Sequence, residues 1–219
     1  MIHISETLAL QTVEDFLTGD DLTRLRKIMD AEQTATGWAP RFQAEVIPAP
    51  SLAQEILHQA TARALPAIQR AMPSIGACAP WAYTELTSGD QVPTHLDGIP
   101  DPAGSPRRIG RIGVVLEDAD QGGEFFIETT SSPTIWTGET VGEADGYLPG
   151  TPLTHRLEHA PNGYPHDSAP TWLISAPRTR WTTDARPGVA VAYGAHVIHG
   201  VTPVRTGRLR KFVTDLLDA

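Results

Sequence analysis

Hydrophobic residues in the first part of the chain recur every three or four positions, which is the spacing of amphipathic helices. Two stripes stand out, Leu22, Leu25, Ile28 and Met29 followed by Leu52, Ile56, Ala60 and Ala64. Thr18 and Asp21 have the spacing of a capping box before the first stripe, as do Ser51 and Gln54 before the second. We expect Pro66 to kink or restart the second helix, because proline cannot donate the interior hydrogen bond. The pattern predicts two helices that buttress a sheet.

From residue 81 onward the hydrophobic residues fall into short extended runs separated by turns. These runs cover residues 81–86, 111–116, 124–128, 171–175, 188–193, 199–204 and 208–216. Segment 118–123 ends in two glycines, which tolerate positive φ, and is predicted to form a hairpin turn. Several short strands with turns between them indicate a sandwich or barrel. The predicted fold class is mainly β with flanking N-terminal helices.

The connection between Thr129 and Pro170 breaks this pattern. Besides many glycines, it contains Pro133, Pro149, Pro152, Pro161 and Pro165. A connection of this length in a compact domain is more often functional than idle, and we expect a lid over residues 129–170. Because no linker divides the chain, we expect one domain over residues 1–219, with a helical buttress at 1–80 and a β core at 81–219.

Composition narrows the range of partners. With 40% hydrophobic and 20% charged residues, the sequence is ordinary for a soluble globular protein. The net charge of -9 argues against nucleic acid, whose protein partners need a basic face. Cys78 is the only cysteine, so no intramolecular disulfide can form, and no uncharged apolar run reaches membrane-spanning length. We expect a protein without a membrane partner that works in the reducing cytoplasm.

A histidine and an aspartate stand two residues apart, in Thr-His95-Leu-Asp97, behind a turn that contains glycine. Residues two apart on an extended strand point the same way. One imidazole and one carboxylate form two thirds of the facial site that holds ferrous iron. The third ligand has to come from elsewhere, and the apolar run that begins at Gly188 ends at His199. These three residues are the candidate metal ligands.

A longer series of residues accompanies them. In chain order it consists of His95-x-Asp97, Gly122-Gly-Glu124-Phe-Phe, Pro187-Gly188 and His199-Gly-Val-Thr-Pro-Val-Arg-Thr-Gly-Arg208. This series resembles the iron(II)- and 2-oxoglutarate-dependent oxygenases, particularly the prolyl-4-hydroxylase-like branch. The resemblance covers residues 81–217 and implies a double-stranded β-helix, the jelly roll shared with cupins. It also implies that His95, Asp97 and His199 bind iron, since the Val-Thr-Pro-Val that follows His199 favours it over His196.

The resemblance further implies a basic residue that binds the far carboxylate of 2-oxoglutarate. An arginine fork suits a carboxylate better than a lysine does. In the family this residue lies about nine or ten positions after the distal histidine. Arg208 lies nine positions after His199 (208 - 199 = 9) and is preferred, while a bulge would give the role to Arg210. Leu86 stands where relatives often carry a tyrosine, and Tyr83 is the nearest aromatic residue.

The implied activity is that of a dioxygenase or hydroxylase. With Fe2+, O2 and 2-oxoglutarate as cosubstrate, such enzymes release succinate and hydroxylate an unactivated carbon. Asp97 disfavours halogenation, because halogenating relatives lack this carboxylate, whereas desaturation, ring closure and epimerisation stay open. Without a recognisable peptide-binding module, we expect a small-molecule substrate such as a free amino acid or a natural-product intermediate. Arg107, Arg108 and Arg111 could face an anionic substrate, under the lid aromatics Trp136, Tyr147, Tyr164 and Trp172.

Two other functions remain open on the sequence. His155-Arg-Leu-Glu158-His159 spells H-x-x-E-H, the zinc signature of inverted zincin peptidases, which has to lie on a helix. Prolines on both sides leave barely two turns, so a polar lid that includes His155, His159 and His166 is favoured. A cupin-like metal-dependent isomerase, or a metal binder without catalysis, would share the jelly roll. Neither would have a reason to carry the arginine pair that follows His199.

Overall fold

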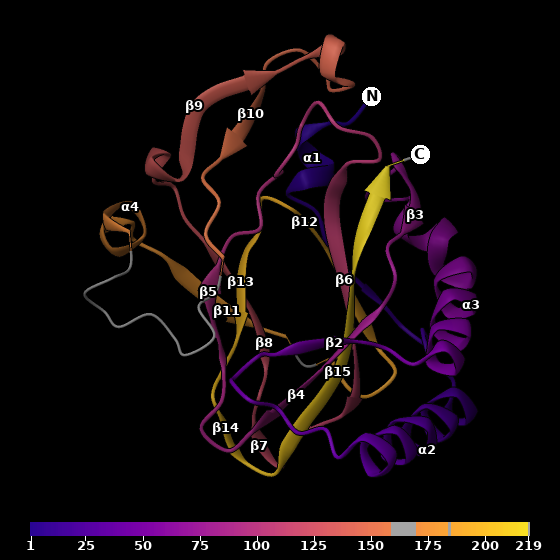
Figure 1. The fold of residues 1–219 in the computed structure, drawn as a ribbon. Helices are drawn as coiled ribbons and strands as arrows, with labels where there is room; N and C mark the ends of the chain where they lie inside the picture. The colour runs from indigo at the N-terminus through magenta and orange to yellow at the C-terminus, as the bar shows by residue number, and fades with distance from the viewer. Residues whose placement is uncertain (159–169, 184, 219) are drawn as a thin grey trace.

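Two antiparallel sheets form the body of the protein, as a computed structural model that describes residues 1–158, 170–183 and 185–218 shows (Figure 1). The strands of the larger sheet are β1 (Leu10–Val13), β2 (Val46–Pro48), β3 (Ile75–Cys78), β4 (Ala82–Thr87), β6 (Arg108–Glu117), β12 (Ala190–Gly194) and β15 (Arg208–Asp218). Their order is β1-β12-β6-β15-β4-β2, with β3 paired to β15. The smaller sheet has the order β11-β8-β13-β5 and consists of β5 (Val92–His95), β8 (Phe125–Thr129), β11 (Thr179–Thr182) and β13 (Ile198–Val201). This is the predicted jelly roll.

Helices cover the outer face of the larger sheet (Figure 1). They are α2 (Gly19–Thr36) and α3 (Ser51–Ile68), while the short α1 (Ile4–Thr7) packs near β6 and β12, and α4 (Thr171–Ser175) lies beside the smaller sheet. The capping box at α2 is confirmed, because the Asp21 amide donates to Thr18 Oγ1 at 3.1 Å and the Thr18 amide donates to Asp21 Oδ2 at 3.2 Å. Leu25 and Met29 of α2 are buried against the sheet, as the stripe predicts.

The start and end of α3 differ from the expectation. Ser51 is the first helical residue and makes no cap. Gln54 instead accepts a hydrogen bond from the Trp81 amide at 2.9 Å and donates to the Trp81 carbonyl at 2.7 Å, which ties the helix to the start of β4. Pro66 lies within α3, and the helix continues to Ile68. Besides helices, the first 80 residues supply three strands of the larger sheet.

Two local predictions are wrong. Residues 171–175 form α4 rather than a strand, because the Pro170 carbonyl accepts hydrogen bonds from the amides of Leu173 and Ile174 and so starts a helical turn. Segment 118–123 is a crossover and not a hairpin, since β6 and β8 on its two sides belong to different sheets. Gly122 and Gly123 do adopt positive φ, of 78° and 79°, as predicted. The short β7 (Gln121–Gly122) pairs there with β14 (Val204–Thr206).

The long connection after β8 folds into a projecting arm (Figure 1). It contains the 3-10 turns η1 (Pro133–Ile135) and η2 (Glu143–Asp145) and the paired strands β9 (Trp136–Val141) and β10 (Thr151–Thr154). Residues 155–158 then return to the smaller sheet, where the amides and carbonyls of Leu157 and Leu96 exchange hydrogen bonds of 2.8 and 3.0 Å. This stretch is extended, so it does not provide the helix that a zinc peptidase motif requires. His159, Tyr164 and His166 lie outside the described residues.

No helix in the described part of the chain combines the length and apolar character needed to cross a membrane.

Candidate metal centre

Three potential metal ligands meet at one end of the smaller sheet. His95 ends β5 and lies directly opposite His199 of β13, with the two ring centroids 4.0 Å apart. Asp97 lies just beyond β5, and its Oδ2 is 3.8 Å from His199 Nε2. The ligand atoms of all three residues lie within 4.8 Å of one another. The structure thus brings together the three residues that the sequence singled out.

Backbone carbonyls orient both imidazoles. The Nδ1 atom of His95 donates to the Pro93 carbonyl at 3.0 Å, and that of His199 donates to the Val197 carbonyl at 2.9 Å. A carbonyl can only accept, so Nδ1 carries the proton and Nε2 is the nitrogen that each ring can offer to a metal. Asp97 Oδ2 is buried and has no hydrogen-bond partner among the described residues. A cation is the partner that such a buried oxygen lacks.

Arginines hold Asp97 in place. Arg111 of β6 approaches Asp97 Oδ1 at 3.3 Å and binds Asp215 Oδ1 at 2.8 Å. Burial opposes the charge of Arg111, but attraction to Asp97, Tyr193 and Asp215 outweighs it and raises the pKa of the guanidinium. From the arm, Arg156 Nε donates to the Asp97 carbonyl at 3.2 Å. One carboxylate oxygen is therefore held by Arg111, and the other is directed at the histidines.

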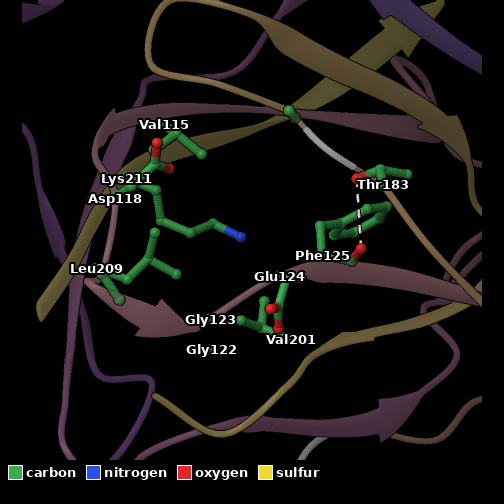
Figure 2. Close-up of a pocket in the computed structure, with 12 residues that line it drawn as sticks. Val115, Asp118, Gly122, Gly123, Glu124, Phe125, Thr183, Val201, Leu209 and Lys211 are labelled. Carbon is green, nitrogen blue, oxygen red and sulfur yellow. Dashed lines mark hydrogen bonds between the residues drawn. The ribbon is translucent and has the colours of Figure 1, made fainter. Parts of the chain in front are cut away.

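A cavity of about 100 Å³ opens beside the triad, between the two sheets. Its lining includes the side chains of His95, His199, Arg111, Tyr193, Thr84 and Lys211. Two smaller cavities, of about 80 and 30 Å³, adjoin it, and all three border on Lys211 and Phe125. Figure 2 shows the cavity of about 80 Å³, with the Lys211 amine pointing into it toward Phe125. The interior of the jelly roll is thus hollow around this one amine.

Lys211 makes no hydrogen bond or ion pair with any residue that the structure describes, although its Nζ lies 5.9 Å from the centre of the Phe125 ring. Burial and, to a lesser extent, the nearby Arg111 lower the pKa of its amine to about 8. Thr84 stands opposite Lys211 in the β4–β15 register. Its buried Oγ1 also lacks a hydrogen-bond partner among the described residues. This amine and hydroxyl are suited to an anionic ligand.

The structure does not bring Arg208 and Arg210 to the triad. They share a face of β15, as their spacing predicts, but it is the face turned toward α2. Arg210 Nη1 lies 2.9 Å from Asp30 of α2 and 3.1 Å from Glu117, and Arg208 Nε lies 3.4 Å from Glu117. The opposite face of β15 carries Leu209, Lys211 and Val213, and these residues line the cavities instead.

Other predicted neighbours of the site also lie elsewhere. The Tyr83 hydroxyl donates to Glu85 at 3.0 Å and accepts from Arg210 at 2.6 Å, on the helix side of the larger sheet. Leu86 is fully buried in a small apolar cluster. Tyr193, which the sequence analysis did not single out, lies with its ring centroid 4.4 Å from that of His199. Its place in the apolar run before His199 is the signal that could have identified it.

Comparison with known proteins was made at the level of sequence and of structure. No family model and no curated protein sequence matches this chain. Solved structures do match. A prolyl-4-hydroxylase of Pseudomonas putida has a TM-score of 0.58 at 13% identity, over 97% of this chain and 94% of that one. The epimerase SnoN, solved with Fe3+, alpha ketoglutarate and nogalamycin RO, has a TM-score of 0.63 at 13% identity, over 97% and 80%.

The chain has the prolyl-4-hydroxylase-like oxygenase fold. HygX from Streptomyces hygroscopicus, solved with nickel and 2-oxoglutarate, matches it as well, with a TM-score of 0.59 at 11% identity over 99% of this chain and 85% of that one. In this oxygenase fold the N-terminal helices and strands belong to the shared architecture, because the matches extend over nearly the whole chain.

Proposed function

We propose that this protein is an Fe(II)- and 2-oxoglutarate-dependent oxygenase that hydroxylates a small molecule. The observation that carries the proposal is the presence, at one cavity, of a buried His-Asp-His cluster and a lysine without an acidic partner among the described residues. The first group suits a metal, and the second suits the far carboxylate of a cosubstrate. The oxygenase fold and the metal and 2-oxoglutarate present in SnoN and HygX support the same assignment.

His95, Asp97 and His199 would hold the iron. Two imidazole nitrogens and one carboxylate oxygen form the facial donor set of non-haem Fe(II) oxygenases. When bound, iron with 2-oxoglutarate and O2 supplies oxidative decarboxylation of the cosubstrate to succinate and oxidation of a substrate carbon. The chain's contribution is orientation, because the carbonyls behind the imidazoles and Arg111 behind Asp97 fix the three donors.

Lys211 and Thr84 would hold the far carboxylate of 2-oxoglutarate. They face each other across β4 and β15 and line the same cavity as His95 and His199. Arg111 is the other cation of this cavity, and Asp97 and Asp215 already engage it. We therefore assign the role that the sequence gave to Arg208 or Arg210 to Lys211. A cupin-like isomerase without a cosubstrate would have no carboxylate ligand for this amine to bind.

The proposal is tested by adding ferrous iron and 2-oxoglutarate to the metal-free protein under anaerobic conditions. We expect a visible metal-to-ligand charge-transfer band that needs both additions. Replacing His199 by alanine should abolish the band, whereas replacing His58, an exposed histidine of α3, should leave it unchanged. Metal binding that proceeds without any effect of 2-oxoglutarate would favour the cupin-like function and refute the proposal.

A further inference from the structure

A second cavity lies near the metal centre and is larger than the first. Its volume is about 230 Å³, compared with about 100 Å³ for the cavity at the triad, and the two share no lining residue. Apolar side chains dominate its wall, namely Leu8, Leu10, Ile127, Ile135, Trp136 and Val197. His196 also lines it, and we call it the His196 cavity. Leu8 and Leu10, which are 45% and 40% exposed, give it an apolar border.

The wall between the two cavities is thin. Ile127 of β8 lies directly opposite His199 of β13, and side chains in such pairs share a face, with Cβ atoms about 5 Å apart. Ile127 and Val197 pack in one cluster with Tyr193, whose ring contacts that of His199. A molecule in the His196 cavity would therefore be separated from a metal ligand by a single layer of side chains.

The described lining of the His196 cavity contains one acidic residue and no lysine or arginine. Glu128 lines the cavity, and its carboxylate is bound by Arg178 at 2.7 Å and by Arg180 at 2.8 Å. The arginines that the sequence offered for an anionic substrate are also engaged, since Arg107 pairs with Asp218. Because the described lining has no lysine or arginine of its own and its one carboxylate is bound by two arginines, it favours an uncharged occupant.

His196 provides the polar element of the wall. Its side chain is 1% exposed, lies edge-on to Trp136 at 5.7 Å, and neither ring nitrogen has a hydrogen-bond partner among the described residues. Burial lowers the pKa of its imidazole to about 4, so the ring is neutral and has one donor and one acceptor. A buried polar group of this kind is normally paired, and a ligand that carries a hydroxyl or carbonyl group would provide the pairing.

We infer that the His196 cavity binds the apolar body of the substrate, and that the substrate is a neutral aromatic or alicyclic molecule with a hydroxyl or carbonyl group. That the bound molecule is a substrate rests on the proposed oxygenase function. An apolar cavity of about 150 Å³ can hold benzene. The His196 cavity is larger than that and has a polar group in its wall, which favours one or two rings bearing an oxygen.

The test uses 4-fluorophenol and fluorobenzene as probes, titrated into the full-length, metal-free protein and followed by 19F NMR. Because one hydrogen bond separates the probes, we expect 4-fluorophenol to bind about tenfold more tightly. Leu10→Gln should weaken both probes about fivefold by removing apolar contact. Leu52→Gln is the matched control, since Leu52 is a 62% exposed leucine of α3, and it should change neither affinity. His196→Phe should keep fluorobenzene binding and remove the preference for the phenol.

Equal affinities in the wild type and in Leu10→Gln would overturn the assignment of the cavity, even if His196→Phe failed to fold. The link to the substrate is tested separately, with ferrous iron and 2-oxoglutarate bound. There, 4-fluorophenol should perturb the charge-transfer band of the wild type, and the change should be weaker in Leu10→Gln. Probe binding that leaves the band unchanged would refute the substrate role. Absence of the band altogether would refute the proposed function, and probe binding to the metal-free protein would be unaffected by that failure.

Discussion

Replacing Lys211 by methionine tests the cosubstrate assignment directly. Methionine keeps an unbranched stem in the cavity wall beside Phe125 but removes the ammonium group. A hydrogen bond to a charged group contributes about 1.5–3 kcal/mol, which corresponds to a loss of about 10–150-fold in 2-oxoglutarate affinity. Thr84 would retain its hydroxyl in the same cavity, so we expect weakened binding and not complete loss.

The pH dependence of the same affinity provides a second measurement. The pKa of the Lys211 amine is about 8 in the ligand-free protein, because burial and Arg111 disfavour its charge. A bound carboxylate favours the ammonium form and raises this pKa, so binding takes up a proton above pH 8. The affinity should be constant below pH 8 and then fall by about tenfold per pH unit, up to the raised pKa. Lys211→Met should lack this decline.

The assay is an anaerobic titration of 2-oxoglutarate into the ferrous protein, read from the charge-transfer band. Arg208→Met is the matched control, because it removes a cation from the same strand on the face turned toward Glu117. The reasoning is refuted if Lys211→Met binds within about threefold of the wild type, or if Arg208→Met loses as much affinity. Circular dichroism of both variants would separate a binding effect from a loss of fold.

Three further changes test other parts of the structure. Arg111→Met should lower the affinity for divalent metal about 10–100-fold in an anaerobic Fe(II) titration, since Asp97 loses its only side-chain donor among the described residues. Gly122→Ala should lower the free energy of unfolding in urea by several kcal/mol, because φ is 78° and the new Cβ would lie 2.1 Å from a backbone oxygen. Gly19→Ala is the control: its Cβ would have no neighbour within 4 Å, so stability should not change. Arg210→Met should lower the free energy of unfolding by about 1–3 kcal/mol, because the buried Tyr83 hydroxyl loses the hydrogen bond that Arg210 Nε donates at 2.6 Å, but it should not alter 2-oxoglutarate affinity. As a control, Arg63→Met removes an exposed arginine that pairs with Asp21, and it should lower the free energy of unfolding by less than about 1 kcal/mol.

Features that depend on neighbours in the chain could be predicted from the sequence. The capping box at Thr18 and the stripe of α2 are local patterns, and the structure has both. The triad could be predicted because His95 and Asp97 lie two residues apart and His199 ends a distinctive apolar run. The helix at residues 171–175 was missed because five residues after a proline carry little periodicity, and it depends on the Pro170 carbonyl and on the packing of Leu173 and Trp172 against distant residues.

Which face of β15 points inward could not be predicted from alternation. Arg208 and Arg210 share one face and Lys211 lies on the other, and the sequence alone does not say which face the helices cover. The packing of α2 decides it, because Asp30 reaches Arg210 from outside the sheet. A preference for arginine over lysine in binding carboxylates then selected Arg208 and Arg210, which lie on the face opposite Lys211, the residue that we propose for this role. The same limit applies to Tyr193, whose position depends on how β12 packs over β13.

The charges inside the jelly roll explain why a metal and a dicarboxylate belong together here. Asp97 and Asp215 face three cations, Arg108, Arg111 and the protonated Lys211, so these side chains carry no net negative charge when the histidines are neutral. Adding Fe2+ alone would add two further positive charges to a buried space, which is costly. In the proposed site, the two carboxylates of 2-oxoglutarate would offset the added charges, one of them at Lys211. Each ligand therefore stabilises the other through the same cavity, which a site for metal alone would not require.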